Sequence, residues 1–302
     1  MIKTSLVTLA LGVFGIGCGI DVGSSGEWVA IDQIHGPLEP GIGATPSLRA
    51  LPAPGSTMRV MTYNILEGGI DPALLAQTIK DDPELSKADV IFLQEAKAFP
   101  EEGEMRTARL AAALGMGWTY VPARPELPTG TFGNAILSRY PITNIEKMDL
   151  PLVTRKRQRI AVAADLQIGD LTLRVVNTHL DTTLNIPGRI RQLRPAIIDQ
   201  PDAVLVAGDF NTSPYAWEDG LVPLISTSPV VDTDQAKVFD RYMQSLGFVN
   251  PTAGIGPTAA KYGVEGRLDA VYTRGLTVTG GNVVYGVTVS DHFPVWIDVT
   301  LP

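Results

Sequence analysis

From residue 57 onward, short apolar runs alternate with polar, Gly- and Pro-containing stretches. Residues 58–63 alternate between apolar and polar side chains and are rich in β-formers, so they predict a strand. The pattern predicts further strands at 90–93, 134–138, 160–166, 171–178, 203–207, 267–272 and 293–299. Asp71 followed by Pro72 marks the start of a helix over 72–80, and further helices are expected at 104–114 and 187–198.

These elements alternate between strand and helix early in the chain, and strands dominate later. Apolar strands of this kind need cover on both faces, or from a second sheet. No change in composition divides residues 57–302, so we expect one α/β domain over that range.

The first 18 residues have the pattern of an export signal. A weakly cationic start precedes an apolar run at 6–16, which is shorter than the roughly 20 residues that cross a bilayer. The run ends at Gly17 and Cys18, and a lone Cys there resembles a bacterial lipobox, whose thiol is acylated. Gly15 replaces the usual Leu of that motif. We therefore expect an exported lipoprotein anchored on the periplasmic or cell-surface side, or alternatively a secreted protein with an incidental Cys.

Residues 19–56 lack hydrophobic periodicity and are rich in Gly and Pro, so they predict an extended linker. The whole chain has 302 residues and a net charge of −8, which argues against a protein that coats nucleic acid through a broad basic surface. A nuclease stays open, because it needs positive charge only along one groove. The single cysteine excludes an intramolecular disulfide framework and a Cys-based structural zinc site.

Candidate chemistry lies where the predicted strands begin or end. Asn64, Glu95 and Asp291 offer hard oxygen ligands, which suit Mg²⁺, Mn²⁺ or Ca²⁺ better than zinc. Two of the three histidines, His179 and His292, fall in the same positions. Such strand-end groups are held rigidly. Together they favour phosphoester hydrolysis, in which a cation and N–H donors offset negative charge while a base activates water.

Seven segments carry a family resemblance, in this order along the chain: Tyr63-Asn64, Gln94-Glu95, 133–139 (GNAILSR), 177–181 (NTHLD), 208–211 (GDFN), 267–269 (RLD) and 290–292 (SDH). Together they resemble the endonuclease/exonuclease/phosphatase family, which includes deoxyribonucleases, abasic-site endonucleases, sphingomyelinases and inositol polyphosphate phosphatases. The resemblance extends from Met58 to Val299. It implies a four-layer α/β sandwich, with two mixed β-sheets packed face to face and helices outside. It also implies a phosphoester hydrolase that uses Mg²⁺ or Mn²⁺, with Ca²⁺ as a further option.

The resemblance also implies roles for individual residues. Glu95 is expected to be the principal metal ligand, with Asn64 and Asp291 close to the same ion. Asp209 and Asn211 match the pair that positions the nucleophile and the phosphate. His292, paired with Asp269, matches a general base, and His179 matches a donor to a phosphate oxygen. Arg159 and Asn134 are expected to contact substrate, although the run 155–159 offers more than one arginine.

Each of these residues also has a structural interpretation, as a turn residue, a cap or a solvated loop pair. The substrate stays open between nucleic acid, as for a nuclease-type phosphodiesterase, and a phospholipid headgroup, as for a sphingomyelinase- or phosphoinositide-phosphatase-like enzyme. A scaffold that binds phosphate ligands without turnover is the remaining alternative. The family resemblance implies a monomer.

Overall fold

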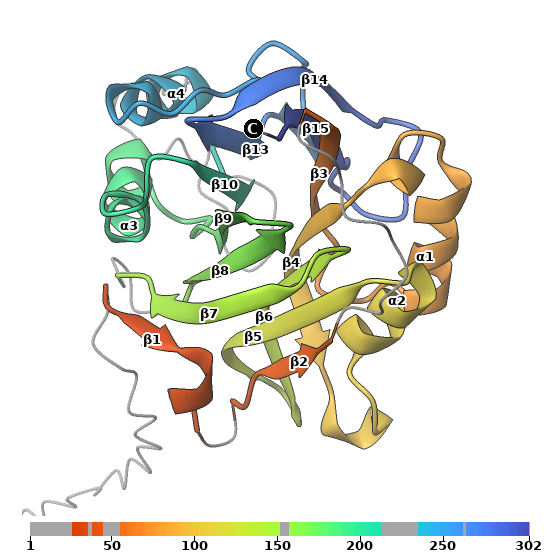
Figure 1. Cartoon of the computed structure of the whole chain (residues 1–302). Helices are drawn as coiled ribbons and strands as arrows, with labels where there is room; N and C mark the ends of the chain where they lie inside the picture. Colours follow the sequence, from red (N-terminus) through yellow and green to blue (C-terminus); the bar gives the residue numbers. More distant parts are fainter. Residues whose placement is uncertain are drawn as a thin grey trace, which may run out of the picture.

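The computed structural model describes residues 26–35, 38–44, 55–151, 157–212, 235–261 and 264–301. Two β-sheets lie face to face, and helices cover the outer face of each sheet (Figure 1). This arrangement confirms the predicted four-layer α/β sandwich.

The larger sheet has seven strands in the order β14-β15-β3-β4-β6-β5-β2. Only β3 and β4 run parallel, and the other neighbours are antiparallel. Helices α1 and α2 pack on its outer face. The bounds are β2 (Gly41–Gly43), β3 (Thr57–Asn64), α1 (Pro72–Asp81), β4 (Val90–Ala98), α2 (Arg106–Leu114), β5 (Gly117–Glu126), β6 (Gly130–Ser138), β14 (Thr277–Val283) and β15 (Val295–Thr300).

The smaller sheet has six strands in the order β1-β7-β8-β9-β10-β13. β9 and β10 run parallel, with helix α3 between them in the chain. Helices α3 and α4 pack on its outer face, on the opposite side of the molecule from α1 and α2 (Figure 1). The bounds are β1 (Trp28–Ala30), β7 (Ile142–Asp149), β8 (Ile160–Ile168), β9 (Leu171–His179), α3 (Ile186–Ile197), β10 (Val204–Asp209), α4 (Gln235–Ser245) and β13 (Asp269–Arg274).

The remaining elements are short. They comprise a two-stranded hairpin of β11 (Ala259–Lys261) and β12 (Val264–Gly266), and the 3₁₀ turns η1 (Ile31–Gln33), η2 (Leu85–Lys87) and η3 (Pro100–Glu102).

The central strands are buried on both faces. In β3, Met58 and Val60 belong to the core between the sheets, whereas Met61 and Tyr63 face the core under α1 and α2. This alternation follows from the two-residue period of a strand. It explains why the central strands are apolar on both faces, as the sequence pattern predicts.

Local sequence signals predicted several element boundaries correctly. The helix predicted at 72–80 is α1, and its N-cap residue Asp71 accepts hydrogen bonds from the backbone N–H groups of Ala73 and Leu74 at 2.9 and 3.0 Å. The helix predicted at 187–198 is α3, which contains Pro195 within its last turn. The strand predicted at 90–93 continues through Ala98, because a bulge lets β4 keep its pairing with β6.

Four of the longer elements were not predicted, namely β5, β7, β14 and α4, and neither were the short strands β1, β2, β11 and β12. β5 contains Pro122 and Pro125, which argue against a strand because proline donates no ladder hydrogen bond. In the structure β5 pairs with β6 along its length, but β2 covers only residues 118–120 of its other edge. The prolines therefore lie beyond the doubly paired part of the strand.

The linker predicted over 19–56 is wrong for two stretches. β1 pairs with β7, and β2 pairs with β5, so each forms the edge of a sheet of the domain. Backbone hydrogen bonds to these edges order a segment that lacks hydrophobic periodicity. Cys18 lies outside the described residues. Among the helices that the structure describes, none is long and apolar enough to cross a membrane.

Candidate active site

Strand register brings the predicted site residues to one end of the sandwich. Asp209 at the end of β10 lies opposite His179 of the parallel strand β9 and opposite Asp269 of the antiparallel strand β13. In the other sheet, Asn64 at the end of β3 lies opposite Gln94, next to Glu95. The two sheets therefore deliver their functional groups to a shared rim from both sides.

Glu95 has an unusual backbone conformation. Its φ of +62° lies in the left-handed region, and it sits at the bulge of β4 between Leu93 and Ala96. Such a conformation costs free energy in a residue other than Gly, and bulges re-aim side chains next to active sites. The Glu95 carboxylate accepts a hydrogen bond from the backbone N–H of Glu67 at 2.6 Å and one from the side-chain amide of Asn64 at 3.3 Å.

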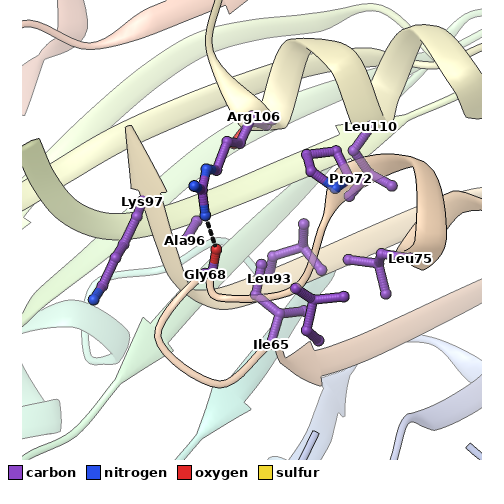
Figure 2. Close-up of a pocket in the computed structure, with 11 residues that line it drawn as sticks. Ile65, Gly68, Pro72, Leu75, Leu93, Ala96, Lys97, Arg106 and Leu110 are labelled. Carbon is purple, nitrogen blue, oxygen red and sulfur yellow. Dashed lines mark hydrogen bonds between the residues drawn. The ribbon is translucent and has the colours of Figure 1, made fainter. Parts of the chain in front are cut away.

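The loop after β3 holds these two side chains in place. Leu66, Glu67 and Gly68 all have positive φ, and the backbone N–H of Leu66 donates to Asn64 Oδ1 at 3.1 Å. A Cβ on Gly68 would lie 2.9 Å from the backbone nitrogen of Lys97, so a side chain there has no room. Figure 2 shows Arg106 of α2 donating to the carbonyl oxygen of Gly68, next to a small and mostly apolar hollow that is lined by the loop, β4, α1 and α2.

Asp209 is the most densely contacted carboxylate of the group. Its Oδ2 accepts a hydrogen bond from the Asn64 amide at 2.9 Å, and its Oδ1 accepts one from the backbone N–H of Asn211 at 2.8 Å. The Nε2 atoms of His179 and His292 lie 3.5 and 3.8 Å from Asp209 Oδ2. Burial, reinforced by the negative charge of Asp269, raises the pKa of Asp209 to about 7.

His292 and Asp269 form a buried pair. His292 Nδ1 lies 2.7 Å from Asp269 Oδ2, which also accepts a hydrogen bond from Thr258 Oγ1 at 2.8 Å. Burial disfavours the imidazolium, but the charges of Asp269 and Asp209 outweigh burial and raise the pKa of His292 to about 10. His292 is therefore a cation at neutral pH, with Nε2 directed at Asp209.

His179 has the opposite ionisation. Arg159 Nη1 lies 3.0 Å from His179 Nδ1, and because a guanidinium can only donate, Nδ1 is the acceptor. Burial and the positive charge of Arg159 lower the pKa of His179 well below its usual range. The remaining proton is on Nε2, which is buried without a hydrogen-bond partner in the described part of the chain. This N–H lies 3.5 Å from Asp209 Oδ2 and 3.9 Å from Glu95 Oε1, and it is suited to bind an oxygen atom of a ligand.

The structure places the other predicted residues less centrally. Asn211 contributes its backbone N–H, while its side-chain amide donates to the carbonyl of Leu180 at 2.9 Å. Asn134 is buried between the sheets and donates to the carbonyl of Ile160 at 3.4 Å, a contact that fits a structural role. Asp291 lies between the two sides of the site, since its charge helps to raise the pKa of His292 and also that of Tyr63, the residue before Asn64.

Two residues that support the site, Thr258 and Ser290, received no role from the sequence. Thr258 accepts hydrogen bonds from the backbone N–H groups of Leu268 and Asp269 and donates to the Asp269 carboxylate, but no motif marks it. Ser290 donates to the carbonyl of Asn64 at 2.8 Å and thereby joins two segments 226 residues apart. Ser290 belongs to the segment 290–292 that the sequence singled out, but its link to Asn64 is visible only in the structure.

The donor set fits a divalent cation. Carboxylate oxygens are ligands that hard cations prefer, and Glu95 and Asp209 present them on either side of the Asn64 side-chain amide, whose NH2 group donates to both. Ligand atoms of Asp209, Asp269 and His292 also lie within 4.8 Å of one another. Of these three, Asp269 and His292 are already committed to each other by their 2.7 Å contact. The Glu95 side of the group is therefore the better place for a cation.

Comparison with known proteins agrees with this geometry. A family model described as Endonuclease/Exonuclease/phosphatase family matches residues 61–292. A search of curated proteins finds no match. An endonuclease/exonuclease/phosphatase structure from Beutenbergia cavernae superposes with a TM-score of 0.61 at 22% identity, covering 81% of this chain and 72% of that chain.

Two eukaryotic structures share the fold. The human Nocturnin catalytic domain with bound sulfate anion superposes with a TM-score of 0.54 at 18% identity, covering 82% of this chain and 94% of that chain. D. rerio TDP2 complexed with single strand DNA product superposes with a TM-score of 0.55 at 17% identity, covering 81% of this chain and 99% of that chain. The match over most of the chain, the shared fold and the buried carboxylate–histidine site lead to one conclusion: the chain belongs to the endonuclease/exonuclease/phosphatase family of phosphoester hydrolases.

Proposed function

We propose that this protein is a divalent-metal-dependent hydrolase of phosphodiester bonds, of the nuclease type, and that it acts outside the cytoplasm. The observation that carries the proposal is the convergence of Glu95, Asn64, Asp209, His179 and the His292–Asp269 pair at one rim of the sandwich. A buried group with one carboxylate of raised pKa and two histidines of opposite ionisation has the parts needed to bind a phosphate and activate water.

Glu95 and Asn64 would hold the cation, Mg²⁺ or Mn²⁺, with Asp291 as the third proposed ligand. When bound, such a cation withdraws charge from the phosphate oxygens and lowers the barrier to attack by water. The backbone N–H of Glu67 and the loop 66–68 orient the Glu95 carboxylate toward that position.

The chain's own residues divide the remaining work. The neutral His179 donates its Nε2–H to a phosphate oxygen, and Arg159 holds its ring by the other nitrogen. The cationic His292 opposes negative charge that develops on the phosphate, while Asp269 holds it in that form. Burial and the charge of Asp269 raise the pKa of Asp209, so we propose this carboxylate as the base, a role that the family resemblance gives to His292.

One feature favours a nucleic acid over a phospholipid headgroup as substrate. The export-type N-terminus suits an enzyme for either substrate outside the cytoplasm. One similar structure, D. rerio TDP2, was determined with a single strand DNA product. The lipid headgroup hydrolase is the second hypothesis, and the same assay separates the two.

The test is hydrolysis of bis-p-nitrophenyl phosphate, plasmid DNA, RNA and sphingomyelin by the purified protein, with and without EDTA. We expect EDTA to abolish turnover and Mg²⁺ or Mn²⁺ to restore it. Glu95→Gln should lower kcat by about 100-fold or more and weaken Mg²⁺ binding measured by calorimetry. Glu104→Gln, which changes an exposed glutamate, is the matched control and should behave as the wild type. Turnover that survives complete chelation, or a Glu95→Gln variant with wild-type kcat, would contradict the proposal.

A further inference from the structure

Arg124 lies beside the active site, although it belongs to no motif. It follows the bulge of β5 between Pro122 and Arg124 and pairs with Phe132 of β6. Its guanidinium carbon lies 3.7 Å from the centroid of the Phe132 ring, and that ring lies 6.2 Å from the ring of His179. The bulge thus directs a cation toward the histidine that faces the phosphate.

Arg124 is one of three arginines gathered on this side of the site. The guanidinium carbon of Arg159 lies 5.9 Å from the same Phe132 ring. Burial, together with the positive charges of Arg159 and Arg157, lowers the pKa of Arg124 to about 10, and the charge of Arg157 also acts on Arg159. Three clustered cations in a chain with a net charge of −8 repel one another, and an anion bound among them would relieve that repulsion.

The guanidinium of Arg124 is incompletely paired. Its Nη1 is buried and has no hydrogen-bond partner among the described residues. Its Nη2 lies 3.9 Å from Glu126 Oε2, and Glu126 also accepts a hydrogen bond from Lys97 Nζ at 3.1 Å. The neighbouring Arg159 has a buried Nε that likewise lacks a partner within the described ranges. Buried donors without acceptors cost free energy, so these groups are suited to a ligand with several acceptor oxygens.

The two nitrogens of His179 separate this cluster from the reaction centre. Nε2 faces Asp209 and Glu95, whereas Nδ1 faces Arg159. Opposite edges of one ring therefore meet the carboxylates and the arginines. A phosphate attacked next to Asp209 would contact Nε2, and an anion at the arginines would lie on the far side of the ring.

We propose that Arg124, with Arg157 and Arg159, forms a subsite for a second phosphate group of the substrate, next to the phosphate that is cleaved. This inference rests on the proposed phosphodiesterase activity. An arginine can bind a phosphate through two parallel N–H donors. The Arg124 guanidinium packs on the Phe132 ring, which leaves its N–H donors available at the edge of the guanidinium plane. The enzyme would then prefer a nucleotide chain with a phosphate neighbouring the scissile bond over one that contains only the scissile phosphate.

The test compares a dinucleoside monophosphate with the same molecule carrying an added terminal phosphate at its 5′ or 3′ end. We expect the wild type to have the higher kcat/KM on a phosphorylated form, mainly through a lower KM. In Arg124→Gln this preference should fall by about tenfold or more. Arg124→Lys keeps the positive charge but loses the two parallel N–H donors, so it should retain part of the preference. This variant replaces Arg124→Gln in the test if Arg124→Gln does not fold. Arg191→Gln, at an exposed arginine of α3, is the control and should keep the full preference.

Two results would overturn the subsite. In one, Arg124→Gln lowers kcat/KM equally on all substrates, bis-p-nitrophenyl phosphate included, which would assign Arg124 to the scissile phosphate. In the other, the preference is unchanged. If the wild type hydrolyses no diester at all, the proposed activity is refuted. The subsite is then tested separately, by measuring the binding of the phosphorylated dinucleotide with calorimetry. Weaker binding to Arg124→Gln than to the wild type would support it, and equal binding would overturn it.

Discussion

Substituting Gly208 by alanine tests whether the register between β9 and β10 positions the catalytic groups. Gly208 has a φ of +151° and directly precedes Asp209. A Cβ on this residue would lie 1.9 Å from the carbonyl oxygen of Thr178, the residue before His179. Real Cβ atoms essentially never approach closer than 3.0 Å, so one strand must move by about 1 Å.

The size of the effect follows from that displacement. Forcing an extra carbon into a close-packed interior costs about 1–3 kcal/mol. For a domain of this size each kcal/mol corresponds to about 2–4 °C in Tm, so Gly208→Ala should lower Tm by roughly 2–12 °C. Asp209 and His179 lie opposite each other in these two strands. A misplacement of about 1 Å in the catalytic geometry costs about 100-fold in rate, which sets the expected loss of kcat.

The assay measures Tm by calorimetry and kcat on bis-p-nitrophenyl phosphate for Gly208→Ala and for Gly286→Ala. A Cβ on Gly286 would meet no atom within 4 Å, and the φ of Gly286 is not positive, so its substitution should change neither value. The Tm measurement does not depend on the proposed activity. A folded Gly208→Ala variant with the Tm and kcat of the wild type would refute the argument from close approach.

Three further predictions concern other parts of the chain. In the chelated protein, the free energy of unfolding should fall as pH rises from 6.5 to about 10, because folded His292 keeps a proton that the unfolded chain releases, and urea denaturation of His292→Asn should show a flatter profile. Arg106→Met removes the hydrogen bond to Gly68 and should weaken Mg²⁺ binding by about tenfold in calorimetry; an unchanged Kd would count against the loop's role. Cys18→Ser should release the protein from membranes in fractionation, and a variant that stays bound with an unmodified N-terminal mass would contradict the lipid anchor.

Local chemistry explains what could be predicted about the fold. Asp71 starts α1 because its side chain accepts hydrogen bonds from free N–H groups at the helix end, and Pro72 favours the first position because it has no N–H group. Neither effect needs a distant residue. β5 was missed because the cost of Pro122 and Pro125 depends on which edge of the strand is already paired. β1 and β2 were missed because their order comes from sheet edges that distant strands provide.

The same division holds for the active site. The sequence by itself singled out Asn64, Glu95, Asp209 and His292 as candidates, since they stand beside apolar runs in a recognisable order. Only the tertiary structure decided how these side chains are placed and which of them are charged. The left-handed conformation of Glu95 and the opposite ionisation of the two histidines arise from contacts between residues 20 or more positions apart in the chain.

Arg124 shows the limit most clearly. Nothing beside it in the chain marks it as functional, and its place next to His179 results from a bulge in β5 and from the packing of β6 against the second sheet. Residue type and spacing in the sequence indicate the local preference of each segment for helix, strand or turn. Burial, charge and hydrogen bonding between remote segments set the pKa values and the ligand subsites, and these arise only once the two sheets have packed together.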